Sequence, residues 1–231
     1  MKVSVIISAF NTEMYIEECL DSVFKQNFSN YDVILGIDGC NTTLKKIKEL
    51  KNKYENLKVY WFEENSGPYL VFNSLVNFCD SEIISRFDAD DIMLENHLTE
   101  NVKLLEENKY ILAQCQNFIH PDINKITKIY NPNGLITLFK KDFIEVNGFD
   151  NWRCGADSDL IKRLNINNFK ITKTTIPTIL RRIHDLNLTN TNNQFGFKSD
   201  YRKKIDKIRE GRKQAKLLEF FTYPKEIIRI F

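Results

Sequence analysis

The sequence predicts an α/β protein with a mostly parallel central sheet, helices on its flanks and a C-terminal helical extension. Strand-like apolar runs alternate with segments whose apolar residues recur at helical spacing throughout the first half of the chain. The run Val3–Ile7 is rich in β-branched residues, as expected of a strand buried on both faces of a parallel sheet. This rhythm indicates βαβ units, whose ligands bind beyond the carboxyl ends of the strands.

The first half gives its strand and helix patterns in a regular order. After Val3–Ile7, apolar residues from Tyr15 to Phe24 predict a helix, with Asn11 or Thr12 as the expected N-cap. Further strands are predicted at 32–38, 57–62 and 82–87, and further helices at 44–54 and 69–78. Most of these strands are thus followed by a turn and a helix. The loops after the strands are therefore expected at one edge of the sheet.

The second half is less regular. Residues 157–164 predict a short helix, and residues 170–185 predict two strands separated by a break at Pro177. From about Lys198 the sequence becomes charged and helical. We therefore expect one domain over residues 1–195, with halves 1–95 and 96–195, followed by a basic amphipathic helical tail over 196–231.

Composition limits the class of protein. The chain has 231 residues and a net charge of +2, so no overall basic field points to nucleic acid. Its five cysteines are far apart and form no Cys-x-x-Cys pair, which favours a reducing cytoplasm over a disulfide framework. No apolar run reaches the length of a membrane span or resembles a signal peptide.

Three carboxylates stand where the fourth predicted strand ends. Asp88, Asp90 and Asp91 repel one another when ionised, and a cation such as Mg²⁺ or Mn²⁺ would relieve that repulsion. The alternative is that they cap the following helix, where negative charge is also favourable. The spacing alone does not decide between the two.

Six further polar segments follow predicted strands or open helices in a fixed order along the chain. They are SAFN at 8–11, IDGCN at 37–41, ENSGPYLVFNSL at 64–75, NGFD at 147–150, CGADSDLIKRL at 154–164 and RRIHDLNLT at 181–189. Together with FDADD at 87–91, this ordered set resembles the inverting family 2 glycosyltransferases of GT-A fold. The resemblance covers roughly residues 2–190 and depends on the order of the motifs rather than on any one of them.

The resemblance implies a nucleotide-sugar pocket in the first half, residues 1–95, and an acceptor site in residues 96–195. The implied pocket comprises Ser8, Ala9, Phe10, Asn11, Asp38, Asn65, Gly67, Asp88 and Ala89. Within it, Asp38 matches the residue that binds the base, typically uracil, and Asp88 matches the residue near the ribose or donor sugar. A turn-forming role of Asp38 before Gly39 is the alternative.

The resemblance also implies a metal site and a general base. Asp90 matches the ligand of Mn²⁺ or Mg²⁺ that bridges to the diphosphate, and His184 matches a histidine that completes this site in many relatives. Asp157 matches the aspartate that deprotonates the acceptor hydroxyl. Two departures stand out: Ala156 replaces the usual glutamate before the base, and Phe72 replaces an arginine found in many relatives.

The function implied is metal-dependent transfer of a sugar from a UDP-sugar to an acceptor hydroxyl, with inversion. A nucleotidyltransferase is one alternative, although the loop after the first strand lacks the glycines and basic residues typical of that class. A catalytically inactive sugar-nucleotide-binding module is the other. The acceptor is expected to be a glycan, a lipid-linked sugar or another hydroxyl compound.

The tail is the most basic part of the sequence. Nine basic residues between 198 and 216 face three acidic ones, so this segment carries about +6 while the whole chain carries +2. Leu217, Leu218, Phe220 and Phe221 follow directly. A helix packed on the domain would explain this pattern, and so would peripheral contact with an anionic membrane or, less favoured, with a nucleic acid acceptor.

Overall fold

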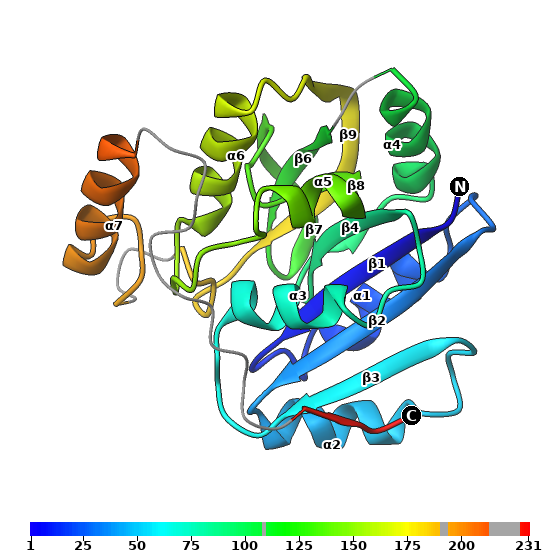
Figure 1. Ribbon diagram of the computed structural model, residues 1–231. Coiled ribbons are helices and arrows are strands. Elements are labelled where there is room, and N and C mark those ends of the chain that lie inside the picture. The colour runs from blue at the N-terminus through cyan, green and yellow to red at the C-terminus, as the bar shows by residue number, and fades with distance from the viewer. Residues whose placement is uncertain (108–109, 190–193, 213–226) are drawn as a thin grey trace.

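A mixed β-sheet with helices on both faces forms the protein, as seen in a computed structural model that describes residues 1–107, 110–189, 194–212 and 227–231 (Figure 1). The strands are β1 (Val3–Ala9), β2 (Tyr31–Asp38), β3 (Leu57–Phe62), β4 (Ile83–Asp88), β5 (Ile92–Met93), β6 (Tyr110–Ile119), β7 (Asp122–Tyr130), β8 (Ile136–Phe139), β9 (Ile171–Ile183) and β10 (Ile227–Arg229). The helices are α1 (Ile16–Val23), α2 (Asn41–Glu49), α3 (Pro68–Val76), α4 (His97–Leu105), α5 (Lys140–Glu145), α6 (Ala156–Ile166) and α7 (Asp200–Gly211).

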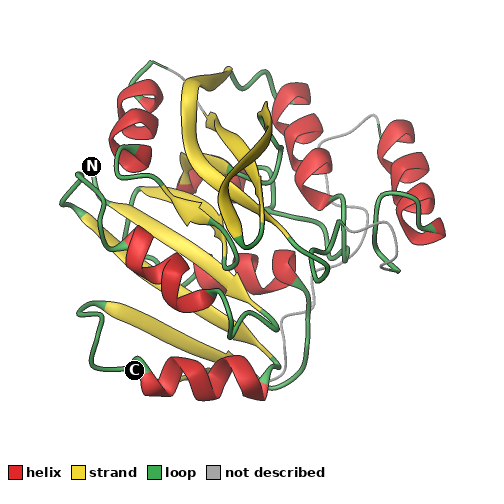
Figure 2. Ribbon diagram, turned by 180° about the vertical axis from the view of Figure 1, so that it is seen from behind, coloured by secondary structure: helices red, strands yellow, loops and turns green. Residues whose placement is uncertain are grey.

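The first half forms the parallel part of the sheet, as its sequence pattern predicts. Strand β1 lies between β2 and β4, and β3 continues the sheet beyond β2, all in parallel register. Val5 and Ile7 belong to one buried cluster and Ile6 to the other, so β1 contributes to the core on both faces. Helix α3 lies in front of these strands in Figure 1, and α1 lies in front in the reversed view of Figure 2.

The second half makes the sheet mixed. Strand β8 pairs antiparallel with β4 and β6, whereas β6 and β9 are parallel to each other. The predicted break at Pro177 is wrong, because β9 continues from Ile171 to Ile183. Its pairing with β6 shifts register on both sides of Gln114, the partner of Pro177, and this irregularity accommodates a residue that cannot donate a ladder hydrogen bond.

Two further sequence expectations are corrected. Neither Asn11 nor Thr12 caps α1 with its side chain; the N-cap position is Tyr15, and the carbonyl of Thr12 accepts from the amides of Tyr15 and Ile16. In the part of the tail that the structure describes, α7 is helical, whereas residues 227–229 form β10, antiparallel to β3. This pairing covers a strand edge that would otherwise be exposed.

The described part of the tail uses several of its charges internally. Arg209 lies 3.0 Å from Asp206, and Arg212 forms buried ion pairs within the domain. The apolar residues at 217–221 lie outside the described residues, so the membrane contact stays a prediction. No helix in the described ranges has the length and apolar character needed to cross a bilayer.

His97 ties three elements together in the interior. Its ring is 1% exposed and lies within hydrogen-bond distance of Asn101 of α4 (2.9 Å), Thr178 of β9 (3.0 Å) and, more loosely, Ser85 of β4 (3.4 Å). Burial lowers the pKa of His97 to about 3, so the folded protein holds this imidazole neutral.

Acidification should therefore destabilise the fold through His97. Below its ordinary pKa near 6.5 the unfolded chain binds a proton at this site that the folded chain does not, so stability falls as pH falls. The loss attributable to this group is about 2 kcal/mol between pH 7 and pH 5. Urea unfolding of wild type and His97→Gln at both pH values measures it. Equal pH dependence in the two proteins would contradict the assignment.

Candidate active site

A cavity of about 910 Å³ opens at the carboxyl ends of β1, β2 and β4. Ten of the twelve residues that the sequence predicts for the site line it: Ser8, Phe10, Asn11, Asp38, Asn65, Gly67, Asp88, Ala89, Asp90 and Asp157. Ala9 is fully buried beneath it, and His184 lies behind Asp90. The fold thus brings together motifs that are far apart in the sequence.

The loop after β1 forms one wall of the cavity. Asn11 adopts a left-handed backbone conformation, with φ of 54°, which turns the chain sharply after Phe10. Its amide donates to the thiol sulfur of Cys40 at 3.4 Å, and its side-chain oxygen accepts from the same thiol at 3.1 Å. Phe10 is left 46% exposed and faces the cavity.

Asp38 holds the loop that follows β3. Its two carboxylate oxygens accept from the backbone amides of Ser66 (2.6 Å) and Gly67 (2.8 Å). Burial raises the pKa of Asp38, and these two amides oppose that shift. Arg153 braces the same loop by donating to the carbonyl of Asn65 at 3.1 Å and to its side-chain oxygen. If Asp38 contacts a nucleobase, it does so with a carboxylate whose two oxygens already accept hydrogen bonds from the loop amides.

Asp88 lies beside a buried arginine that the sequence analysis did not assign. Arg86 approaches Asp88 to 2.6 Å and donates to the carbonyl of Gly134 at 2.7 Å. Desolvation raises the pKa of Asp88, the charge of Arg86 lowers it, and the neighbouring Asp90 raises it further. Arg86 thus supplies part of the positive charge that stabilises the ionised form of Asp88 beside Asp90.

Asp90 and His184 meet as the resemblance implies. Asp90 Oδ2 lies 2.8 Å from His184 Nε2 and accepts from the Asn187 amide nitrogen at 3.0 Å. The amide of Leu186 donates to His184 Nδ1, so Nε2 is the ring nitrogen that faces Asp90. Asn187 Oδ1 accepts from the backbone amide of His184, so a residue missed by sequence reasoning orients both groups.

Asp91 does not cap a helix, although it lies at the cavity wall beside Asp90. Its side chain is buried and accepts from the backbone amide of Arg182 at 2.9 Å, which joins the end of β4 to β9. The N-cap position of α4 is Asn96. Burial raises the pKa of Asp91, and Asp90 and Asp88 raise it further. Of the three acidic residues, Asp91 is the structural one.

The donor set at Asp90 fits a cation that shares its ligands with a substrate. Within the described ranges no group of three or more His, Cys, Asp or Glu residues could enclose a metal ion. Asp90 and His184 offer one carboxylate and one imidazole nitrogen, and Mg²⁺ or Mn²⁺ commonly binds through few protein ligands plus substrate phosphates. A cation held by this pair would need further ligands, such as the oxygens of a substrate diphosphate.

Asp157 lies in the first turn of α6 and faces the cavity. One oxygen accepts from the amide of Ser158 at 2.7 Å. A Cβ at Gly134 would come within 3.3 Å of the other oxygen and 2.9 Å of Arg86, so the missing side chain leaves room for both groups. The free oxygen can accept a proton from a group bound in the cavity.

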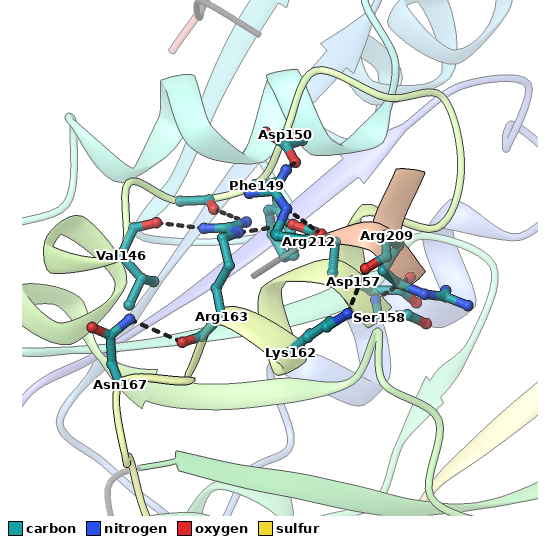
Figure 3. Close-up of polar contacts among 12 residues, drawn as sticks. Val146, Phe149, Asp150, Asp157, Ser158, Lys162, Arg163, Asn167, Arg209 and Arg212 are labelled. Atoms are coloured by element: carbon teal, nitrogen blue, oxygen red, sulfur yellow. Dashed lines mark hydrogen bonds and ion pairs between the residues drawn. The ribbon is translucent and has the colours of Figure 1, made fainter. Parts of the chain in front are cut away.

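Asp159, two positions later, has a different environment. It is fully buried and forms ion pairs with Arg163 (2.8 Å) and Arg212 (2.9 Å), in the cluster shown in Figure 3. It does not line the cavity. The two aspartates of this helix therefore divide into a cavity-facing residue and a structural one.

Four arginines of the cavity wall were missed by sequence reasoning. They are Arg86, Arg153, Arg181 and Arg202. They come from β4, the segment before α6, β9 and α7, so no local spacing connects them. Arg181 is the first residue of the motif RRIHDLNLT and Arg86 directly precedes FDADD, whereas Arg153 and Arg202 lie outside the motifs.

Known proteins share this architecture. Residues 4–157 match the family model described as Glycosyl transferase family 2. The O-antigen biosynthesis glycosyltransferase WbnJ of Escherichia coli is 28% identical over 160 residues, covering 62% of this chain and 63% of WbnJ. The poly(ribitol-phosphate) beta-N-acetylglucosaminyltransferase TarS of Staphylococcus aureus (strain Mu50) is 34% identical over 113 residues, covering 47% of this chain and 19% of TarS.

Solved structures agree on the fold. The crystal structure of S. aureus TarS 1–349 in complex with UDP has a TM-score of 0.67 at 22% identity, covering 79% of this chain and 61% of that one. The mannosyltransferase PcManGT of Pyrobaculum calidifontis, in complex with GDP-Man and Mn²⁺, has a TM-score of 0.67 at 16% identity, covering 80% and 58%. The chain matches less than two thirds of the length of each of these relatives. Because the family model spans most of the sequence, the chain belongs to glycosyl transferase family 2.

Proposed function

We propose that the protein transfers a sugar from a nucleotide-diphosphate sugar, preferably a UDP-sugar, to an acceptor hydroxyl with inversion and with the aid of a divalent cation. The observation that carries this proposal is that one cavity contains Asp90, paired with His184, and the first-turn carboxylate Asp157. The Asp90–His184 pair thus suits the leaving diphosphate, and Asp157 suits the acceptor hydroxyl.

The choice of donor and metal is supported by the relatives. TarS has been crystallised with UDP and with UDP-GlcNAc, and PcManGT with GDP-Man and Mn²⁺. All three ligands are nucleotides with a diphosphate. In this chain the predicted nucleotide pocket at Ser8–Asn11 and Asp38 adjoins the Asp90–His184 pair, which suits a diphosphate placed between them.

Each residue of this chain has a distinct part in the mechanism. Asp90 and His184 would hold Mn²⁺ or Mg²⁺, which neutralises charge on the departing diphosphate. Asp157 accepts the proton of the acceptor hydroxyl as the oxygen attacks the anomeric carbon. Attack occurs on the face opposite the leaving group, so the configuration inverts.

Two other functions give different products. A nucleotidyltransferase would release inorganic diphosphate, whereas a sugar transferase releases the nucleoside diphosphate; family membership favours the second. A module that only binds sugar nucleotides would release neither. Incubation with UDP-sugars and Mn²⁺, with UDP assayed, and a separate incubation with UTP, sugar 1-phosphates and Mn²⁺, with diphosphate assayed, distinguish the three.

Removal of the metal, or of Asp90, should weaken nucleotide binding. We expect EDTA to lower UDP affinity at least about tenfold, equivalent to about 1.4 kcal/mol. Asp90→Ala should show the weak affinity with or without metal, because the carboxylate that positions the cation is gone. Calorimetric titration of UDP, with Mn²⁺ or with EDTA, measures both effects.

The control for this experiment is Asp80→Asn, since the Asp80 side chain is 80% exposed and lies outside the cavity. It should bind UDP like wild type in both buffers. Equal UDP affinity of the wild type in Mn²⁺ and EDTA would contradict the metal-dependent mechanism. Equal affinity of wild type and Asp90→Ala in Mn²⁺ would contradict the assignment of Asp90.

A further inference from the structure

Three of the four cavity arginines have partners that account for their charge or position. Arg86 pairs with Asp88, and Arg153 is held by Asn65. Arg181 donates to Thr189 at 2.9 Å; burial lowers its pKa, and Tyr130 and the carboxylates of Asp91, Asp88 and Asp90 raise it, so its charge acts on the acidic group. These three belong to the walls of the donor side.

Arg202 differs from the other three. Its Nε donates to the carbonyl of Phe195 at 3.3 Å, and its guanidinium lies 5.0 Å from the ring centroid of Phe197. Among the described residues, neither terminal nitrogen has a hydrogen-bond partner and no carboxylate lies within ion-pair distance. It is a half-buried cation in a cavity wall with two nitrogens left for a ligand.

Arg202 lies beside the start of the helix that carries Asp157. A Cβ added to Gly155, the N-cap of α6, would be 3.9 Å from Arg202 Nη1. Burial raises the pKa of the Cys154 thiol, while Arg202 lowers it and Asp157 raises it, so both charges act on the same neighbour. An acceptor hydroxyl that reaches Asp157 therefore comes close to Arg202.

The guanidinium is held in place before any ligand arrives. The amide of Arg202 donates to the N-cap side chain of Ser199 at 3.1 Å, and Tyr201 of the same turn accepts from the amide of Arg153 at 3.1 Å. Phe197 is 62% exposed yet lines the cavity beneath the guanidinium. A fixed guanidinium binds an anion with little ordering cost and can do so through two parallel hydrogen bonds.

We propose that the acceptor carries an anionic group, a phosphate or a carboxylate, near its reacting hydroxyl. Arg202 binds this group, and the ring of Phe197 packs against the guanidinium and lines the cavity beside it. The inference rests on the proposed function, because it presumes that an acceptor enters beside Asp157. It makes Arg202 a specificity-determining residue for charged over neutral acceptors.

Binding of small probes tests the proposal without activity. Glycerol 3-phosphate, glucuronate and neutral glycerol are titrated into the full chain by calorimetry or ligand-observed NMR, with UDP and Mn²⁺ present. We expect at least one anionic probe to bind about tenfold tighter than glycerol. Arg202→Gln should remove the difference, and Arg202→Lys should retain part of it because the charge stays while the two-nitrogen geometry is lost.

The matched control is Lys204→Gln, which removes one charge from the exposed side of the same helix and should leave the preference intact. Which anionic probe wins distinguishes phosphate from carboxylate acceptors. Thermal unfolding shows whether Arg202→Gln is folded. If it is not, the proposal is tested by whether Arg202→Lys prefers anionic probes over glycerol less strongly than wild type does.

Three results would overturn the proposal. They are equal affinity of wild type for charged and neutral probes, an unchanged preference in both Arg202 variants, and a loss of UDP affinity in Arg202→Gln. The last result would place the guanidinium on the donor instead. Absence of UDP binding in wild type would count against the proposed function and not against the role of Arg202. The two failures can be told apart because the probes can also be titrated without UDP.

Discussion

Replacing Asp157 with Asn is expected to lower the rate of sugar transfer by about 10²- to 10⁴-fold, the usual contribution of a general base. Asparagine keeps the size of the side chain and its contact with the Ser158 amide but cannot accept a proton. UDP affinity should stay nearly unchanged, because a base acts in the transition state and not in nucleotide recognition. Initial rates of UDP release and calorimetric titration of UDP measure the two quantities.

The structure makes this prediction sharper than the motif alone. Within ADSDL, either aspartate could be the base by spacing, but only Asp157 lines the cavity, whereas Asp159 is enclosed by Arg163 and Arg212. Asp159→Asn should therefore affect stability more than the chemistry of folded protein. An Asp157→Asn variant with wild-type kcat, measured beside a folded but inactive Asp159→Asn, would show that the base has been assigned to the wrong residue.

The parallel half of the fold could be predicted because its information is local. Buried strands with an apolar centre, such as β2, followed by helices with one apolar face, determine βαβ units almost independently of the rest of the chain. The second half depends on pairing between distant segments. Nothing near Pro177 indicates that β6 shifts its register to keep β9 continuous, and nothing near Ile227 indicates that β3 offers a free edge.

The candidate site divides in the same way. Its acidic residues and His184 stand in motifs at strand ends or, for Asp157, at the start of a helix, and could be placed from the sequence. Arg202 and Asn187 could not, because each acquires its role from a partner brought near by folding: the start of α6 for Arg202, and Asp90 for Asn187. For Asp38 the sequence left two alternatives, and the structure shows that the carboxylate already organises the Ser66–Gly67 loop.

The second large effect concerns a buried cluster that joins α7 to α6. Arg212, at the end of α7, contacts Asp150 (Figure 3). It also lies 2.9 Å from Asp159, which pairs with Arg163. Two aspartates and two arginines, all 5% exposed or less, balance one another's charge. Lys162 adds to this junction by donating to the carbonyl of Arg209 at 2.6 Å.

Arg212→Met should destabilise the protein by about 3–5 kcal/mol, the usual cost of removing one partner from a buried ion pair. Methionine fills much of the space but leaves the two aspartates with a single arginine. Burial already raises the pKa of Asp150 to about 6, against the opposing charges of Arg163 and Arg212. Without Arg212 the pKa of Asp150 should rise further, and part of the loss should be recovered by Asp150→Asn in the same chain.

Urea unfolding at pH 7 measures these effects, with Arg209→Met as the matched control. Arg209 lies on the same helix and pairs with Asp206, but both side chains are partly exposed, so its loss should cost no more than about 1 kcal/mol. Both variants remove one positive charge, so the difference between them reports on the buried cluster and not on net charge. If Arg212→Met costs no more than Arg209→Met, α7 is held by its other contacts and not by this cluster. In that case the ordering of Arg202 beside Asp157 would depend on Tyr201 and Ser199, at the other end of the helix, and not on this cluster.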